Sequence, residues 1–376
     1  MRIVVTGWVA PFPTAGFLWH PLSYLLGFRA LGHECWYLED AGDHPWGWDT
    51  ERGHEDPSCA AGIRFLESEL GALGLGDRWV FRHLPGGRHH GMSAEETADV
   101  LAGADVLVNV SLLTPMRPEY RRIPHRLGID TDPVFTQIRL ARGDARTIPE
   151  THTRLYTFGR PPLPAQRHEW VPTRQAVATE AWPVAPPPQD GAPFTTVTTW
   201  KAYPAQAWEG VEYGAKDRSF RELLELPRLT GSPLEVALGA GSDPGEGEAL
   251  LAAHGWRVSD SIEATRTSGD YRRFLARSRG EIGVAKHGYV RAQCGWFSER
   301  TCCYLASGRP AVVCDTGWTD WLPSGEGLLA FRTPAEAAGA LAAVNADWDR
   351  HSRAARRLVE EHFRAAEVCR ELLDAA

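Results

Sequence analysis

The chain has 376 residues, a formal net charge of −8 and a sequence pI near 6.0. That length can bury two separate cores. The acidic balance argues against nucleic acid or an anionic membrane as the main partner, since both favour a basic protein surface. No stretch reaches the roughly 18 apolar residues of a membrane span, and the N-terminus lacks the layout of a signal peptide. We therefore expect a cytoplasmic protein.

The first half of the chain has the pattern of a doubly wound α/β domain. A short strand is expected over residues 2–7, followed by a helix with Pro21 in its first turn and His20 as its N-cap. Gly32 ends this helix, and residues 34–39 form the next strand of a right-handed β-α-β unit. Further buried strands are expected over 104–111 and 125–130.

The histidine pair in "GGRHHGMS", residues 86–93, does not indicate a metal site. Adjacent histidines point in different directions, and no third ligand is spaced to join them. We expect this segment to be a loop. The seven cysteines include no CxxC pair, which predicts reduced thiols rather than zinc ligands or disulfides.

A linker rich in Pro and Gly, "WPVAPPPQDGAP", spans residues 182–193 and separates two α/β patterns. We expect an N-terminal domain over 1–185, a C-terminal domain over 186–350, and a closing helix over 351–376. In the second domain, strands are expected over 194–200, 233–241, 281–285 and 310–315, and helices over 219–229, 245–256, 269–278 and 298–307.

Ligands of open α/β sheets bind at the carboxyl ends of the strands, so the loops there supply the candidate site residues. In the second domain, a helix start at Ser298, Glu299 and Arg300 offers free N–H groups to an anion. Two cations beside such a helix start suit a diphosphate better than a carboxylate. The other loops contain Trp200, Lys201, the turn from Gly239 to Gly241, Lys286 and His287. The chain has only three lysines, which are Lys201, Lys216 and Lys286.

The glycine-rich turn after residue 238 could be taken for a dinucleotide fingerprint. Its glycines at 239, 241, 245 and 247 do not give GxGxxG, and no acidic residue clearly ends the next strand about 20 residues on. The sequence therefore argues against an oxidoreductase that uses a nicotinamide cofactor.

His20 is the candidate general base of the first domain. A helix N-terminus disfavours the imidazolium, so the ring should be neutral near pH 7 and able to accept a proton. Asp130 or Asp132, which follow a strand, could orient it in a His-Asp dyad. Aromatic residues next to a site often stack on ligands, although a tryptophan-rich core is the alternative. They crowd the first loops at Trp8, Phe12, Phe17, Trp19, Trp46 and Trp48.

Two α/β domains, a proline-rich hinge and a C-terminal helix resemble the GT-B glycosyltransferases. "GFLWHPLSYLLGFRALGHE", from Gly16, is similar to the glycine-rich loop and first helix of that family, with His20 where many members place an active-site histidine. "GWFSERTCCYLASGRPAVVCDTG", from Gly295, is similar to the donor segment. The resemblance implies two Rossmann-like domains facing each other across a cleft, with the diphosphate at Ser298 to Arg300 and Lys216 as a further phosphate contact.

The chain also departs from the family pattern. Cys303 occupies the position where retaining members usually carry the glutamate that binds the donor ribose, so Glu299 or Glu326 would have to replace it. Trp200 stands in place of the usual arginine at the end of the first strand of the second domain. The stereochemical course therefore cannot be assigned from the sequence.

These observations predict a glycosyltransferase that moves a sugar from a nucleoside diphosphate sugar to a small-molecule acceptor, without a metal or other cofactor. The aromatic residues of the first loops favour an aromatic, polyketide-like or nucleoside-like acceptor, as in natural-product biosynthesis. His20, Asp130 and Asp132 are the expected catalytic residues, and Gly16, Trp8 and Trp19 the expected acceptor contacts. Two alternatives stay open: a sugar-nucleotide epimerase of the same fold, which needs a carboxylate pair near the donor, and a non-catalytic sugar-nucleotide-binding protein. The expected donor contacts are Trp200, Lys201, Lys216, Lys286, His287, Ser298, Glu299, Arg300 and Glu326.

Overall fold

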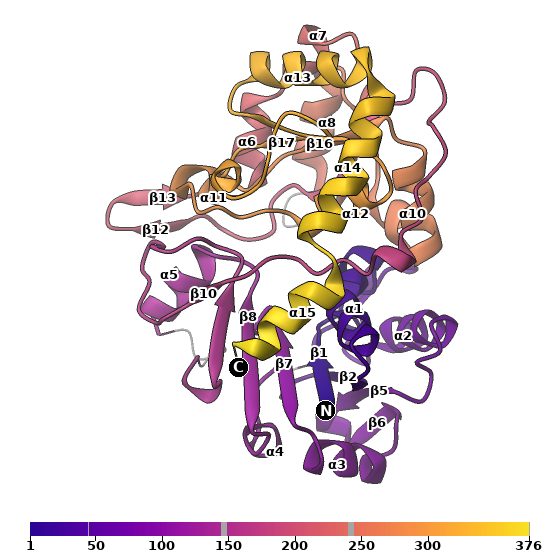
Figure 1. Cartoon of the computed structure of the whole chain (residues 1–376), viewed down its shortest axis with the longest axis vertical. Helices are drawn as coiled ribbons and strands as arrows, with labels where there is room; N and C mark the ends of the chain where they lie inside the picture. The colour runs from indigo at the N-terminus through magenta and orange to yellow at the C-terminus, as the bar shows by residue number, and fades with distance from the viewer. Residues whose placement is uncertain (44, 144–148, 240–243, 376) are drawn as a thin grey trace.

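The computed structural model describes residues 1–43, 45–143, 149–239 and 244–375. Two sheets, each flanked by helices, lie one above the other, with the first half of the chain (indigo to magenta) below and the second half (pink to yellow) above (Figure 1). The expected pair of doubly wound α/β domains is thus confirmed. Gly241, in the expected glycine-rich turn, lies outside the described residues.

The lower sheet reverses its strand order between β1 and β7. Within the described residues its order is β10-β9-β8-β7-β1-β2-β5-β6, and only the β5–β6 pair is antiparallel. All four strands expected in this half are present. The strands are β1 (Arg2–Thr6), β2 (Glu34–Asp40), β5 (Trp79–His83), β6 (Arg88–Gly91), β7 (Val106–Val110), β8 (His125–Asp130), β9 (Arg154–Thr157) and β10 (Val171–Pro172), with a small hairpin of β3 (Trp48–Asp49) and β4 (His54–Glu55) beside them.

The segment expected to be a loop at residues 86–93 is in part the edge strand β6. Gly87 adopts the left-handed conformation with φ 59°, which lets the chain reverse and pair with β5. The prediction was wrong because a four-residue polar edge strand has no apolar alternation to mark it.

Helix α1 (Ala15–Ala30) begins earlier than expected, with Thr14 at the N-cap, so His20 lies inside the helix. Pro21 is also inside, where it removes only one backbone donor. Its ring packs close to Gly7, where an added Cβ would lie 2.9 Å from Pro21 Cγ. The other helices of this half are α2 (Ala60–Ala72), α3 (Ala94–Ala102), α4 (Pro118–Arg121) and α5 (Phe135–Ala141).

The upper sheet is parallel and reverses its order between β11 and β16. Its strands in the described part of the chain run β15-β14-β11-β16-β17-β18. They are β11 (Phe194–Thr199), β14 (Leu234–Gly239), β15 (Arg257–Asp260), β16 (Gly280–Gly283), β17 (Ala311–Cys314) and β18 (Leu328–Phe331); a hairpin of β12 (Gln206–Trp208) and β13 (Val211–Tyr213) follows β11.

The helix expected over residues 219–229 is two helices, α6 (Lys216–Glu222) and α7 (Leu226–Leu229). Pro227 lies in the first turn of α7, because proline cannot continue a helix that is already hydrogen-bonded. The remaining helices around the sheet are α8 (Pro244–Ala253), α9 (Ser261–Thr265), α10 (Ser268–Ala276), α11 (His287–Ala292), α12 (Glu299–Ala306) and α13 (Pro334–Ala346).

The expected single closing helix is also two helices, α14 (Trp348–His362) and α15 (Ala365–Asp374), and the expected boundary at residue 350 falls inside α14. The break forms because backbone groups of Phe363 and Ala365 bond Val177, at 2.7 and 2.8 Å, instead of continuing the helix. As a result α15 returns to the lower domain beside α1 (Figure 1).

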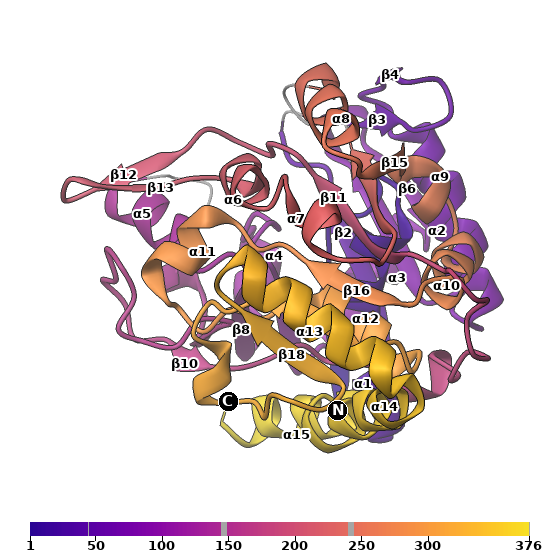
Figure 2. The same cartoon turned by 90° about the horizontal axis from the view of Figure 1, so that it is seen from above.

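The two domains touch on the side of the β12–β13 hairpin. The hairpin extends over α5 in both views (Figures 1 and 2), and Arg142 donates to Gln206 Oε1 at 2.5 Å and to the Ala207 carbonyl at 2.6 Å. An apolar cluster that includes Phe135 and Tyr289 fills this junction. The carboxyl ends of the two sheets therefore face each other beside a closed junction.

Candidate active site

Each sheet has one point where its strand order reverses, and ligands of open α/β sheets bind outside the carboxyl ends of the strands at that point. In the upper domain this crevice lies between the ends of β11 and β16. In the lower domain it lies between the ends of β1 and β7. The sequence-predicted residues can be placed relative to these two crevices.

Lys216 lies at the upper crevice, at the start of α6, as predicted. Its Nζ donates to Thr198 Oγ1 on β11 at 2.8 Å. The pKa of Lys216 is lowered to about 7, mainly by burial and then by the neighbouring charges of Arg300 and Lys286. Lys216 is thus a buried cation whose only hydrogen-bond partner among the described residues is a neutral hydroxyl.

Ser298 is the N-cap residue of α12 but does not use its side chain as a cap. The hydroxyl makes no hydrogen bond to any described residue, although Ser298 is buried and lines a narrow pocket between α12 and the ends of β16 and β17. A buried hydroxyl without a partner costs stability. The helix start therefore combines an unsatisfied hydroxyl with the free N–H groups of a first turn.

Arg300 lines the same pocket, but its guanidinium is anchored in the sheet. Nε donates to Glu281 Oε1 at 2.6 Å and Nη1 to the Val197 carbonyl at 3.0 Å. Arg300 thus contributes charge to the crevice from a fixed position. His287 has a similar anchoring role, since its Nδ1 accepts the Gly214 N–H at 3.2 Å two residues before Lys216.

Lys286 does not lie free in the crevice. Its ammonium donates to Asp132 Oδ1 of the lower domain at 2.8 Å and also to the hydroxyl of Tyr203. The ring centroids of Phe135, Tyr203 and Tyr289 lie 5.0, 4.5 and 5.2 Å from it. Lys286 is thus held in an aromatic cage at the domain junction and acts on Lys216 only through its charge.

Asp132 is committed to the same cage. Besides Lys286 it accepts hydrogen bonds from Tyr203, at 2.7 Å, and from Tyr289. Burial alone would raise the pKa of Asp132, but Lys286 and the two phenols outweigh it and hold the pKa below its ordinary value. Asp130 accepts from Gln137 at 3.2 Å and Thr157 at 3.1 Å, and burial raises its pKa to about 6.

The His-Asp dyad expected from the sequence is therefore not formed. Among the described residues no hydrogen bond joins His20 to Asp130 or Asp132, because both carboxylates have other partners. His20 instead stacks on Phe158, with ring centroids 5.7 Å apart, and its Nε2 is buried without a partner. Burial lowers the pKa of His20 and nearby Glu299 opposes the shift, so burial rather than a helix N-terminus keeps the ring neutral.

Glu299 connects the two halves of the site. Its charge acts on His20 of the lower domain and on Lys216 of the upper domain. The candidate base and the cationic crevice therefore both lie within electrostatic range of the start of α12.

Three of the expected ligand contacts lie elsewhere. Trp200 is fully buried in the upper core, where it packs against Phe220. It fits there because Gly247 has no side chain; an added Cβ would lie 2.5 Å from the Trp200 ring. Trp19 is 3% exposed and packs against Trp182 in the core. Glu326 precedes β18, at the amino edge of the sheet opposite the crevice, and pairs there with Arg350.

Trp8 and Gly16 do lie at the lower crevice. Trp8 follows β1, is partly exposed and stacks on Trp46 with ring centroids 5.9 Å apart and planes 1° apart. Gly16 lies in the first turn of α1, and an added Cβ there would meet nothing within 4 Å. Lys201 is partly exposed, one residue beyond Trp200.

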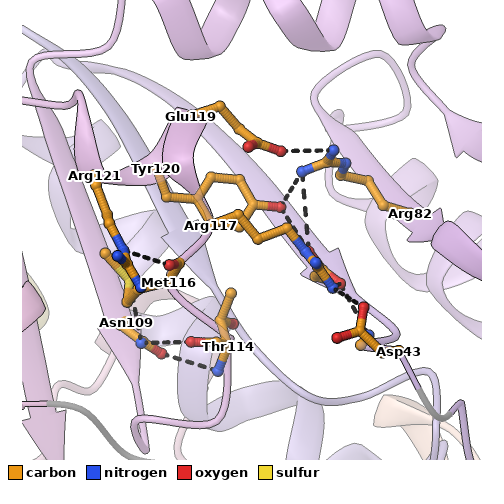
Figure 3. Close-up of polar contacts among 11 residues, drawn as sticks. Asp43, Arg82, Asn109, Thr114, Met116, Arg117, Glu119, Tyr120 and Arg121 are labelled. Carbon is orange, nitrogen blue, oxygen red and sulfur yellow. Dashed lines mark hydrogen bonds and ion pairs between the residues drawn. The ribbon is translucent and has the colours of Figure 1, made fainter.

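Sequence reasoning missed a polar network at the carboxyl ends of β2 and β5 (Figure 3). Arg117 donates to both carboxylate oxygens of Asp40, at 2.6 and 3.1 Å, and the Tyr120 hydroxyl donates to it at 3.0 Å. Arg82 bonds Glu119 and Tyr120. The only sequence signal was an aspartate ending a buried strand, and its partners lie about 80 residues away.

A second set of hydrogen bonds fixes the loop that follows β7. Asn109 Nδ2 donates to the Thr114 carbonyl at 3.0 Å, and its Oδ1 accepts the Thr114 N–H at 3.2 Å (Figure 3). Arg121 bonds the Met116 carbonyl at 2.7 Å. Most polar groups on this side of the lower crevice are therefore paired with one another, whereas Arg82 Nε and His83 Nδ1 are buried without a partner among the described residues.

Over the described ranges, no group of three or more His, Cys, Asp or Glu side chains is placed to hold a metal ion. Within the same ranges, no helix combines the length and apolar character needed to cross a bilayer.

The sequence matches no protein-family model and no curated protein. Solved structures match over nearly the whole chain. AviGT4, a glycosyltransferase involved in avilamycin A biosynthesis, has 13% identity and a TM-score of 0.51, covering 99% of this chain and 96% of that one. Anabaena HepE in complex with UDP and glucose has 10% identity and a TM-score of 0.52, covering 100% and 99%.

A third match is an alpha-glucosyltransferase in complex with UDP and a 13-mer DNA, with 9% identity, a TM-score of 0.58 and coverage of 100% and 98%. At such identities the likeness establishes the fold alone. The two facing, mainly parallel sheets and the C-terminal helix that returns to the first domain agree with it. The chain adopts the GT-B fold of these glycosyltransferases.

Proposed function

We propose that this chain is a glycosyltransferase that moves a sugar from a nucleoside diphosphate sugar to a hydroxyl group of a small molecule, without a metal ion. The observation that carries the proposal is the start of α12. There the buried, unpartnered hydroxyl of Ser298 lies beside a first turn of free N–H groups and near Lys216 and Arg300. A diphosphate satisfies the hydroxyl, the N–H groups and the cations together.

The same groups supply what the leaving group needs. When the bond between the anomeric carbon and the phosphate oxygen breaks, negative charge develops on the diphosphate, and fixed cations with a helix N-terminus stabilise it. Arg300 is held by two hydrogen bonds before any ligand binds, so little reorganisation is required. These protein charges take the role that a divalent cation has in other transferases.

His20 is the proposed general base. The acceptor oxygen forms a bond to the anomeric carbon, the diphosphate departs with the electrons of the broken bond, and His20 Nε2 takes the acceptor proton. Three features support this role: Nε2 has no partner, burial lowers the pKa of the ring, and Glu299 links His20 to the diphosphate crevice. A carboxylate behind the histidine forms no part of this mechanism, because Asp130 and Asp132 are bonded elsewhere.

A small-molecule acceptor fits the charge of the chain better than nucleic acid. One structural neighbour was solved with DNA, but a net charge of −8 gives no general attraction for a phosphate backbone. Another neighbour takes part in avilamycin A biosynthesis. The first-domain crevice presents aromatic rings rather than a basic face.

The proposal is tested by incubating the protein with a panel of nucleoside diphosphate sugars and measuring two quantities: the thermal midpoint, which binding must raise, and the release of nucleoside diphosphate. Binding with release of the diphosphate supports a transferase. Binding with isomerisation of the sugar and no release indicates the epimerase, and binding without any turnover indicates a binding protein. No binding of any member of the panel contradicts the proposal.

A further inference from the structure

Exposed apolar side chains gather at the crevice of the lower domain. Six large hydrophobic side chains are exposed among the described residues, and three of them lie on segments that follow strands β1, β2 and β7. They are Phe17, Trp46 and Leu113, with 45, 40 and 49% of their surface exposed. These segments border the reversal point between β1 and β7, which is where a ligand of this sheet binds.

Two of these side chains belong to an aromatic platform made of Trp8, Phe12, Phe17 and Trp46. Trp8 stacks on Trp46, and Phe17 contacts the edge of Trp8 with centroids 5.9 Å apart. Phe12 contacts Phe17 in the same edge-on manner at 5.8 Å. Stacked and edge-to-face pairs of this kind hold one another in place.

The backbone beneath the aromatic platform is fixed as well. Both carboxylate oxygens of the buried Glu39 accept N–H groups of the loop after β1, from Val9 at 2.6 Å and Ala10 at 2.8 Å. Trp46 Nε1 donates to Glu55 at 3.2 Å. A ligand that binds such a preorganised surface loses little free energy to ordering it.

The aromatic platform lies next to the proposed base. Phe17 and His20 are three residues apart on α1, so they occupy neighbouring positions on one face of the helix. A molecule on the platform can therefore present a hydroxyl toward His20 and the diphosphate crevice.

The chemistry of the crevice favours a flat, mainly apolar ligand. Sugars are bound by an aromatic face together with polar side chains that hydrogen-bond the ring hydroxyls. Here most polar groups beside the crevice are already paired: Asp40 with Arg117 and Tyr120, and Asn109 with Thr114 (Figure 3). Beside the unpaired Nε2 of His20, the exposed groups that these residues offer a ligand are mainly ring surface.

We propose that the aromatic platform is the acceptor-binding surface and that the acceptor is a planar, mainly apolar ring system carrying a hydroxyl group. This inference rests on the proposed glycosyltransferase function and specifies its acceptor class. In the transfer, the ring hydroxyl forms the new bond to the anomeric carbon and gives its proton to His20, while the diphosphate leaves.

The experiment compares binding of 1-naphthol and methyl glucoside to the full chain by quenching of tryptophan fluorescence. The variants are Trp46→Ala, Phe17→Ala and Trp46→Phe. Leu229→Ala is the matched control, because Leu229 is exposed to a similar degree, 54%, on α7 of the other domain. The thermal midpoint of each variant verifies that it folds.

We expect 1-naphthol to bind and methyl glucoside not to bind. Trp46→Ala and Phe17→Ala should each weaken 1-naphthol binding about tenfold, since each removes an aromatic contact. Trp46→Phe should retain most of the affinity, and Leu229→Ala all of it. Equal binding by the Trp46→Ala variant, or preferential binding of methyl glucoside, would overturn the proposal.

Two further measurements separate this inference from its alternatives. Vesicles of phosphatidylcholine and phosphatidylglycerol test whether the exposed rings bind a lipid surface instead, and cosedimentation that Trp46→Ala abolishes would overturn the acceptor assignment. Binding of nucleoside diphosphates by the same variants tests the proposed function independently. If the wild type binds no nucleotide the proposed function fails, whereas intact nucleotide binding with unaltered naphthol binding in Trp46→Ala rejects only the acceptor site.

Discussion

The two crevices that face each other in this molecule differ in what they leave unpaired. In the upper domain, Lys216 has no carboxylate hydrogen-bonded to it and the Ser298 hydroxyl has no hydrogen-bond partner among the described residues. Burial together with neighbouring cations lowers the pKa of Lys216 to about 7. In the lower domain the charged groups are paired with one another around Asp40, and aromatic rings are exposed instead. We infer the ligand of each crevice from the groups that it leaves unpaired or exposed. These groups suit a polyanion in the upper domain and a flat apolar molecule in the lower domain.

Lys216 and Lys286 show the same contrast at a smaller scale. Both were expected to contact the diphosphate. Within the described part of the chain Lys216 bonds only a threonine hydroxyl, whereas Lys286 is paired with Asp132 and surrounded by three aromatic rings. Only Lys216 is free to exchange its present partner for phosphate at small cost.

The largest effect is expected from His20→Ala. Turnover should fall by about 10²–10⁴, the loss typical of a missing general base, while the affinity for donor stays the same. Because burial lowers the pKa of His20, the activity of the wild type should persist below the ordinary histidine pKa of about 6.5. Initial rates and nucleotide titrations check both points, with His33→Ala in the turn after α1 as the control. Unchanged turnover would exclude His20 as the base.

Lys216→Met should weaken binding of a nucleoside diphosphate by about 10- to 100-fold, since it removes one charge-assisted hydrogen bond worth about 1.5–3 kcal/mol. Calorimetric titration measures this loss. Arg350→Met removes one positive charge at the opposite edge of the sheet and should leave the affinity unaltered. An equal loss in both variants would mean that overall charge, rather than the crevice, attracts the nucleotide.

Asp132→Asn should destabilise the closed junction between the domains. It leaves Lys286 without its carboxylate in a site where the two side chains are 17% and 22% exposed, so we expect a loss of about 1–3 kcal/mol in the free energy of unfolding. Nucleotide affinity should change less than in Lys216→Met. Denaturant unfolding and the same titrations test this, and a stronger effect on affinity than on stability would place Asp132 in the ligand site.

Glu326→Gln should have the smallest effect. Glu326 pairs with Arg350 at the amino edge of the upper sheet, where both side chains are about half exposed, and such pairs contribute little. Nucleotide affinity and turnover should both equal those of the wild type. A weakened affinity for the nucleoside relative to inorganic diphosphate would restore Glu326 as a ribose contact.

The sequence predicts the buried strands of this fold well because strands covered on both faces are continuous apolar runs. It misses β5 and β18, which are short although mostly buried. It also misses β6, a polar strand at the edge of the lower sheet, and the β12–β13 hairpin, which forms a small sheet of its own. In the site, the helix start at Ser298 and the position of Lys216 depend on local spacing and were predicted. The pairing of Asp132 with Lys286, 154 residues apart, and the burial of Trp200 against Gly247 depend on tertiary contacts that local patterns do not encode.

The most direct test of the diphosphate crevice is a calorimetric titration of nucleoside diphosphate into the wild type and Lys216→Met between pH 6 and pH 9. With the pKa of Lys216 lowered to about 7, the side chain is charged below that pH and loses its proton above it. Wild-type affinity should therefore fall as the pH rises above about 7, by at most tenfold per pH unit. The weaker affinity of Lys216→Met should be nearly independent of pH over the same range. Parallel pH profiles for the two proteins, or equal affinities, would contradict binding of the diphosphate at this crevice.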